Sequence, residues 1–141
     1  MASFIFERRL NLPVEELWPI LTDFTKAPTP DIKVEVLKTG DPDAGGTGAV
    51  RMITIGKDRV RQVLDKVNPP ENYAYRITDH RLIKSYYAKI DLKDEENSTL
   101  FCYQADLKPA IPFTGGIACA KAKSGLVTLL NSIEKHYCKD D

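Results

Sequence analysis

The chain has 141 residues, of which 43% are apolar, and its 20 lysine and arginine residues balance its 20 aspartate and glutamate residues. This size and apolar content predict a single domain over residues 1–141 that buries a core without disulfides or metals. The balanced charge argues against nucleic acid as a partner and gives no general attraction to an anionic membrane, although a local charged patch is compatible with it.

The first part of the chain predicts a strand, a helix and a loop. Residues 3–10 are rich in strand-forming residues and lead into a turn at Pro13. Apolar residues at helical spacing then predict a helix, which Pro19 should kink or shorten. The two prolines within residues 28–30 favour a loop or one short turn before a strand at 32–37.

The middle of the chain predicts an antiparallel meander, because turn-forming sequences alternate with short runs of strand-forming residues. The expected strands are 49–55, 60–67, 73–78, 85–92 and 99–107, and the turns between them include 41–48, 56–58, 68–72 and 94–98. Such short connections favour antiparallel pairing, since parallel strands need long crossovers.

The longest helical pattern covers residues 117–137. Its apolar residues recur at steps of three or four, which places them on one stripe that must cover another surface. The members of the stripe are Ala118, Ala122, Leu126, Leu129, Ile133 and Tyr137. Lys121 is assigned to the opposite, polar side. Gly125 interrupts the helix at a cost of about 1 kcal/mol relative to alanine, and we interpret it as a close approach of the helix to the sheet or to a ligand.

The order and spacing of several segments carry a family resemblance. They are LNLPVEELWPILTDF, GTGAVR, IGKDRVRQVLD, YAYRI, YYAKIDL, TLFCYQADL and SGLVTLLNSIEK. Together, from about Phe4 to Lys135, they resemble the polyketide cyclase/dehydrase-like branch of the START-related superfamily. The resemblance implies an α+β helix-grip fold, in which a curved seven-stranded antiparallel sheet wraps around a long C-terminal helix. It also implies two short helices after the first strand and an internal cavity, but it fixes no activity.

Strand alternation predicts which side chains face that cavity, because every second side chain points the same way. The candidate ligand-binding residues are Arg51, Ile53, Gln62, Leu64, Tyr73, Tyr75, Tyr86, Ala88, Phe101 and Tyr103 from the strands, with Ala122 and Leu126 from the helix. Tyrosine rings with a hydroxyl tip suit a flat ligand that carries a few oxygens. Aromatic residues are also common in half-buried strands for packing reasons alone.

Two of these candidates are polar and depart from the family pattern. The pattern is similar to Gly-x-x-Arg followed one strand later by Glu, whereas this chain has Gln62 at the second place. A neutral amide accepts a hydrogen bond from Arg51 without neutralising its charge. Arg51 then reaches water at the cavity mouth, pairs with Asp79 or Glu35, or binds an anionic or enolate oxygen of the ligand. An ordinary ion pair at a strand edge is the competing interpretation.

Catalytic and metal chemistry find little support in the sequence. His80 and His136 are the only histidines, and we interpret both as surface residues. The histidines and cysteines lack metal-ligand spacing, and the glycine cluster at 45–48 precedes a strand instead of a helix, unlike a phosphate loop. We therefore expect no metal and no cofactor.

The compartment follows from the N-terminus and the cysteines. Charged residues begin at Glu7, so the apolar stretch before it is too short for a signal sequence or a membrane span, and no membrane insertion is expected. Cys102, Cys119 and Cys138 are an odd number without CxxC spacing. These features favour a cytoplasmic protein, and the sequence leaves open whether it forms a homodimer.

The preferred function is non-covalent binding or carriage of a small hydrophobic molecule. One alternative is a polyketide cyclase/dehydratase-like enzyme, in which Arg51 and the cavity tyrosines would polarise a keto group. Another is an interaction module whose loops around Ile83 and 109–116 form a ligand-dependent gate.

Overall fold

The computed structural model describes residues 2–23, 27–38, 40, 47–55, 58–78 and 80–138. Within these residues it has seven strands and two helices. The strands are β1 (Ala2–Leu10), β2 (Lys33–Lys38), β3 (Val50–Ile55), β4 (Asp58–Asn68), β5 (Asn72–Thr78), β6 (Ile83–Asp94) and β7 (Thr99–Pro109). The helices are α1 (Val14–Thr22) and α2 (Gly115–Tyr137). The turns expected at 41–46 and 56–57 lie outside the described residues.

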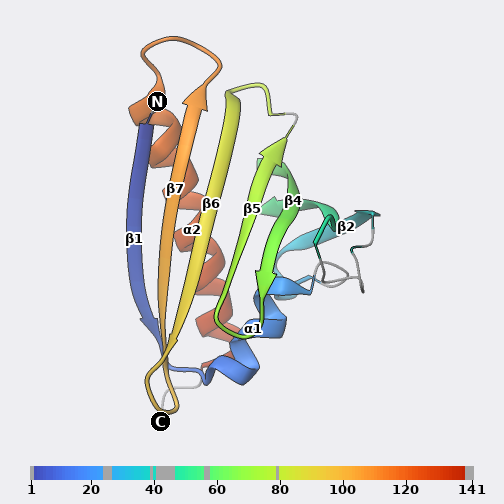
Figure 1. Ribbon diagram of the computed structural model, residues 1–141, viewed down its shortest axis with the longest axis vertical. Coiled ribbons are helices and arrows are strands. Elements are labelled where there is room, and N and C mark those ends of the chain that lie inside the picture. The colour runs from blue at the N-terminus through green and yellow to red at the C-terminus, as the bar shows by residue number, and fades with distance from the viewer. Residues whose placement is uncertain are drawn as a thin grey trace.

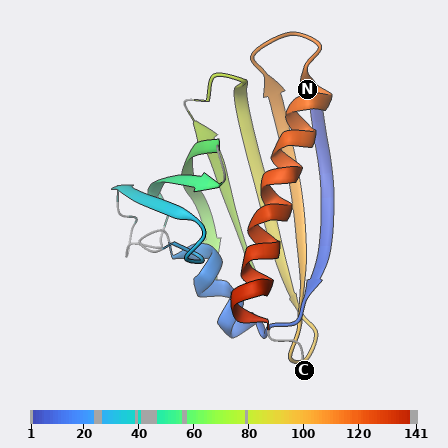
Figure 2. The ribbon, with the colours of Figure 1, turned by 180° about the vertical axis from the view of Figure 1, so that it is seen from behind.

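All seven strands belong to one antiparallel sheet in the order β1-β7-β6-β5-β4-β3-β2. Strands that follow one another from β2 to β7 pair with each other, and β1 pairs with β7 at one edge. The sheet curves around α2, and α1 lies at one end of the molecule (Figure 1). Seen from behind, α2 runs along the concave face of the sheet (Figure 2). This architecture confirms the helix-grip fold expected from the sequence.

Alternation along the strands places the expected side chains in the core. On β7 the residues Phe101, Tyr103, Ala105 and Leu107 are at most 3% exposed, and Gln104 between them is exposed. The same alternation holds on β6, where Ala88 and its apolar neighbours two residues apart are buried. The prediction of the inward faces of these two strands is therefore confirmed.

The region after β1 contains one helix within the described residues. Pro19 lies inside α1 and offers no backbone N–H, and the helix ends three residues later, at Thr22. Residues 27–32, which include Pro28 and Pro30, form a turn closed by a bond from the Ile32 N–H to the Thr29 carbonyl. These prolines disfavour a second short helix in this segment.

The two halves of α2 have different surroundings. In the C-terminal half Leu130 and Ile133 are fully buried, whereas the residues of the N-terminal half are only partly buried or exposed. The expected stripe was therefore wrong at its end, because it included Tyr137, which is 43% exposed, and omitted Leu130. The C-terminal half of α2 is therefore packed tightly against the sheet, and the N-terminal half is packed less tightly. Neither helix among the described residues is long and apolar enough to cross a membrane.

The tightly packed end is fastened by polar contacts. The hydroxyls of Thr29 and Ser132 lie 2.6 Å apart in the interior, and Nε2 of His136 lies 2.9 Å from Oδ2 of Asp31. His136 was expected at the surface, and its side chain is 28% exposed, so this contact lies at the surface of the molecule. The segment 27–32 is therefore attached to the C-terminal half of α2.

Candidate functional site

A cavity of about 210 Å³ lies between the concave face of the sheet and the N-terminal half of α2. Its walls come from β3 to β7, from α2 and from the segment between β7 and α2, and most of its lining side chains are aliphatic. An aliphatic cavity of roughly 150 Å³ is enough to bind benzene. This cavity is therefore large enough for a molecule with one or two rings.

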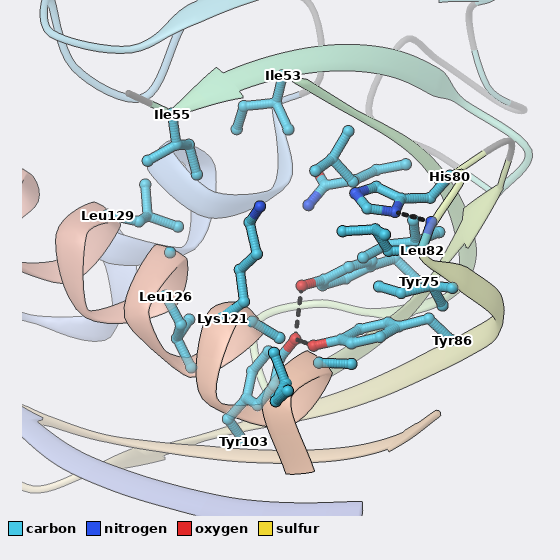
Figure 3. Close-up of a pocket in the computed structure, with 18 of the residues that line it drawn as sticks. Ile53, Ile55, Tyr75, His80, Leu82, Tyr86, Tyr103, Lys121, Leu126 and Leu129 are labelled. Carbon is cyan, nitrogen blue, oxygen red and sulfur yellow. Dashed lines mark hydrogen bonds between the residues drawn. The ribbon is translucent and has the colours of Figure 1, made fainter. Parts of the chain in front are cut away.

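Three tyrosine hydroxyls meet at the floor of the cavity. The hydroxyl of Tyr103 on β7 lies 2.7 Å from that of Tyr75 on β5, and it also bonds to the hydroxyl of Tyr86 on β6 (Figure 3). The register brings them together, because these three strands are adjacent and all three residues point to the concave face. We call Tyr75, Tyr86 and Tyr103 the tyrosine triad.

The three phenols of the triad are neutral, and one of their O–H groups is not used in the hydrogen bonds between them. Burial is the main cause that raises the pKa of each of the three phenols above its usual value. Two hydrogen bonds among three hydroxyls consume two of the three protons. One O–H is therefore available to donate to an oxygen atom of a bound molecule.

Gln62 on β4 has a fixed orientation. Nε of Arg51 on β3 donates to Oε1 of Gln62 at 2.7 Å, and both side chains are at most 8% exposed. Because this bond occupies the amide oxygen, the amide nitrogen of Gln62, which lines the cavity, can present its N–H groups to a ligand. Burial is the main cause that lowers the pKa of Arg51, to about 10, so the guanidinium is still charged at neutral pH.

Lys121 and His80 add polar groups on the outer side of the cavity. Lys121 extends from α2 into the space between the helix and the strands (Figure 3). Nδ1 of His80 accepts the backbone N–H of Leu82 at 3.1 Å, which leaves Nε2 as the protonated nitrogen of the neutral ring. Lys121 was assigned to the polar side of the helix, so its place in the cavity was not expected. For His80 a solvated turn was preferred over a position at the cavity entrance, and the structure places it in the lining.

The cavity lining is rich in donors and contains no carboxylate. Gln62, the tyrosine triad and Lys121 all offer N–H or O–H groups, and no aspartate or glutamate is among the described residues that line this cavity. Oxygen acceptors, neutral or anionic, are complementary to such a lining, whereas an amine cation finds no counter-charge.

The structure places the predicted ligand-binding residues in three positions. Those that line the main cavity are Ile53, Gln62, Tyr75, Tyr86, Tyr103, Ala122 and Leu126. Those that line only a neighbouring hollow of about 20 Å³ are Arg51, Tyr73 and Phe101. Leu64 and Ala88 line neither space and are fully buried in the core. Asp79, one of the suggested partners of Arg51, lies outside the described residues.

Gly125 was expected to allow a close approach of the helix to the sheet or to a ligand, and the structure separates these two alternatives. A Cβ atom built on it would meet no other atom within 4 Å, and the residue lines the cavity. Gly125 therefore leaves open space in the cavity wall, which rules out a close approach of the helix to the sheet and leaves the expected approach to a ligand as a prediction.

A metal centre has no basis in the described part of the chain, where no three His, Cys, Asp or Glu side chains come together in a way that could hold an ion. The three cysteines form no disulfide, and burial is the main cause that raises the pKa of Cys102 and of Cys119. The polar chemistry of the site therefore rests on amide, phenol, imidazole and ammonium groups.

Comparison with solved structures shows the same fold in proteins of low sequence identity. A START superfamily protein from Mycobacterium smegmatis aligns with a TM-score of 0.75 at 16% identity, covering 96% of each chain. The XoxI protein from Bacillus cereus gives 0.75 at 19% identity, covering 97% of this chain and 96% of that one. Truncated norcoclaurine synthase from Thalictrum flavum gives 0.70 at 11% identity, with coverage of 99% and 95%.

Comparison of the sequence with protein families gives a match over nearly its whole length. No protein with a curated description matches the chain. Residues 1–137 match the family described as "Polyketide cyclase / dehydrase and lipid transport", which agrees with the resemblance of the sequence motifs. Since this match spans nearly the whole length, the chain belongs to the polyketide cyclase/dehydrase and lipid transport family.

Proposed function

We propose that the protein binds and carries a small, mainly apolar molecule in the cavity between the sheet and α2. The observation that carries this proposal is the unfilled volume of about 210 Å³ behind apolar side chains. Protein interiors are normally packed with few voids larger than a water molecule. A space of this size, reached from one end of the fold, suits a guest molecule.

The polar groups of the lining narrow the class of guest. The remaining O–H group of the tyrosine triad and the N–H groups of Gln62 favour a ligand with one or two oxygen acceptors, such as a ketone or a carboxylate. Lys121 adds a positive charge toward the mouth, which favours a carboxylate further. Aromatic or alicyclic ketones and acids therefore fit better than amines.

The expected affinity follows from the area that such a guest can bury. Covering about 200 Å² of apolar ligand surface at roughly 25 cal/mol per Å² gives about 5 kcal/mol. Hydrogen bonds to oxygen add to this, and ordering of the ligand subtracts from it. We expect dissociation constants in the micromolar range.

A cyclase-like activity is the second candidate, and the tyrosine triad is the feature that favours it. A neutral phenol that donates to a keto oxygen would stabilise negative charge developing on that oxygen. Such chemistry also needs a base, and the described lining residues include no carboxylate, while Nδ1 of His80 already accepts a backbone N–H. The lining therefore supports binding more strongly than catalysis.

A cytoplasmic location also belongs to this proposal. Its support is that Cys102, Cys119 and Cys138 form no disulfide, as expected for a protein kept in a reducing compartment.

The test uses substitution of Gly125 to fill the cavity. Gly125→Leu places a branched side chain in the open space of the wall, and the loss of a helix-interior glycine should leave stability unchanged or raise it by up to about 1 kcal/mol. Gly116→Leu is the matched control, because Gly116 also lies in α2 with open space around its Cβ position but does not line the cavity.

Binding is measured by calorimetry with three probes of similar size: acetylnaphthalene, naphthoic acid and naphthylmethylamine. We expect the ketone and the acid to bind and the amine to bind at least tenfold more weakly. Gly125→Leu should weaken binding of the ketone at least tenfold, and Gly116→Leu should leave it unchanged. Equal affinity of the wild-type protein and Gly125→Leu would show that the cavity is not the binding site. Native mass spectrometry of the purified protein identifies any molecule that is retained.

A further inference from the structure

Three apolar side chains are exposed where the cavity opens. Ile111, Phe113 and Ile117 are 52%, 103% and 72% exposed, and the first and last of them also line the cavity. They lie in or next to the segment between β7 and α2, which extends beyond the ends of the strands in both views of the fold (Figures 1 and 2). The same end carries the turn between β5 and β6.

Phe113 is unfavourable in two ways for the isolated protein. Its ring is fully exposed to water, and its backbone has a φ of 69°, in the left-handed region that bulky side chains seldom occupy. No packing against the rest of the chain offsets either cost. A contact outside the protein would explain why a large apolar side chain is held at this tip.

The charged residues in the described segments next to these side chains are basic. Arg81, Lys84 and Lys108 are exposed near the tip, and the described segments 80–85 and 107–121 contain no acidic residue. At the opposite end of the molecule, Asp94 ends β6, and Glu95 and Glu96 follow it in the turn to β7, where Glu95 pairs with Arg9 (Figure 1). The basic residues therefore give the cavity mouth a local positive charge.

We propose that the mouth patch, defined as Ile111, Phe113 and Ile117 with Arg81, Lys84 and Lys108, docks on an anionic lipid surface. A protruding wedge of three apolar side chains can enter a fluid interface without a complementary pocket, and basic residues beside it favour anionic headgroups. A stable protein interface would need a much larger and flatter surface, on the order of 800 Å² on each partner. Lipid is therefore the partner that this patch fits.

Docking in this orientation places the cavity mouth against the bilayer. If the cavity holds an apolar guest as proposed above, the guest could then pass between lipid and protein without crossing water. This consequence rests on the proposed function, whereas the docking itself depends only on the mouth patch.

Vesicle co-sedimentation with the full chain tests the docking. The vesicles are phosphatidylcholine alone, or phosphatidylcholine with phosphatidylglycerol in about a 7:3 ratio, a fraction chosen to supply anionic charge. Phe113→Gly removes the ring and relieves the left-handed backbone, so the variant should stay folded. Ile5→Ser is the control, because Ile5 is 72% exposed, as Ile117 is, but lies on β1 on the face of the sheet away from the core.

We expect the wild-type protein to bind the anionic vesicles and to release them at about 0.5 M salt, where surface charges are screened. Phe113→Gly and the pair Lys84→Glu with Lys108→Glu should bind at least fivefold more weakly, and Ile5→Ser should bind normally. The inference would be overturned by an absence of vesicle binding, by normal binding of Phe113→Gly, or by equal binding to the uncharged vesicles. Recognition of Phe113 by a protein partner instead of lipid would also overturn it.

Two variants distinguish the docking proposal from the cavity proposal, because each should abolish one kind of binding and retain the other. Gly125→Leu should bind the anionic vesicles normally and lose acetylnaphthalene, whereas Phe113→Gly should retain acetylnaphthalene and lose the vesicles. Phe113 does not line the cavity, so its loss leaves the binding site intact.

Discussion

Arg51 holds Gln62 in one orientation, because Nε of Arg51 donates to Oε1 of Gln62 at 2.7 Å while both side chains are buried. The two residues face each other in the register of β3 and β4. Only Gln62 lines the main cavity. Arg51 is therefore a positioning residue, which acts on a ligand through the amide that it orients.

A double-mutant cycle checks this relationship. Gln62→Leu should weaken acetylnaphthalene binding about fivefold, the equivalent of one hydrogen bond of about 1 kcal/mol. Arg51→Met should produce a similar loss, because the released amide is free to turn its oxygen toward the ligand. The double variant should lose no more than either single variant.

Naphthoic acid separates this role from direct contact with an anion. If Arg51 binds the carboxylate itself, Arg51→Met should weaken naphthoic acid far more than acetylnaphthalene. Equal effects on the two probes, measured by calorimetry, are the expected result. Circular dichroism of each variant serves as the check that the fold is retained.

The tyrosine triad should make stability depend on pH in the alkaline range. Burial raises the pKa of these phenols in the folded protein, while the unfolded chain ionises near pH 10. Their contribution to stability is therefore fully present below about pH 10 and is lost as pH rises through the folded values. Each phenol adds a slope of about 1.4 kcal/mol per pH unit in that window.

Tyr103→Phe removes the bridging hydroxyl. It also removes the contribution of one phenol to the decline of the unfolding free energy with pH. We expect it to cost about 1–3 kcal/mol at neutral pH, because Tyr75 and Tyr86 lose their shared partner. Urea unfolding between about pH 9 and 11 should then show a shallower decline than in the wild-type protein. Parallel curves for the two proteins would contradict the assignment.

Strand periodicity predicted much of this site, because alternation with a period of two fixes the face of the sheet to which each side chain points. Once the strands were located, Tyr75, Tyr86 and Tyr103 were assigned to the concave face, and the structure brings their hydroxyls together. Alternation cannot say how far along the sheet a space opens. Leu64 and Ala88 have the expected orientation, but they lie in the filled part of the interior.

The helix was harder to interpret, because its period is not a whole number. At about 100° per residue, a stripe built from steps of three and four drifts, so Tyr137 lies roughly 100° around the helix from Ala118. Lys121 lies only about 60° from Ala118 on the other side, close to Gly125. Its place in the cavity could have been found from this spacing, had its charge not suggested solvent.

Asp31 should contribute stability that disappears in acid. It accepts a hydrogen bond from His136, which is the main cause that lowers the pKa of Asp31, and Ser132 and Lys135 lie within 4 Å of the same oxygen. A lowered folded pKa means that the stability is present above the unfolded value of about 3.9 and is lost as pH falls through the folded pKa.

Asp31→Asn should therefore lower Tm slightly at neutral pH, and the difference from the wild-type protein should vanish toward about pH 2. Thermal unfolding at a series of pH values measures this. A difference in Tm that is the same at all pH values would assign the effect to packing and not to charge.

Leu129 and Leu130 are adjacent in α2, and the same truncation should destabilise the protein to different extents at the two positions. Leu130 is fully buried in the core, whereas Leu129 is partly exposed and lines the cavity. Leu130→Ala creates a void in a packed region and should cost about 2–5 kcal/mol of unfolding free energy. Leu129→Ala widens a space that already exists and should cost about 1 kcal/mol, since most of its contacts are not lost.

The binding measurement should reverse that order. Leu129→Ala enlarges the cavity, so we expect acetylanthracene, which is one ring larger than acetylnaphthalene, to gain affinity relative to it. Leu130→Ala should leave the ratio of the two affinities unchanged, because Leu130 does not line the cavity. Equal destabilisation by the two substitutions would mean that Leu129 is as tightly packed as Leu130, and the space for a guest beside Leu129 would then be absent in solution.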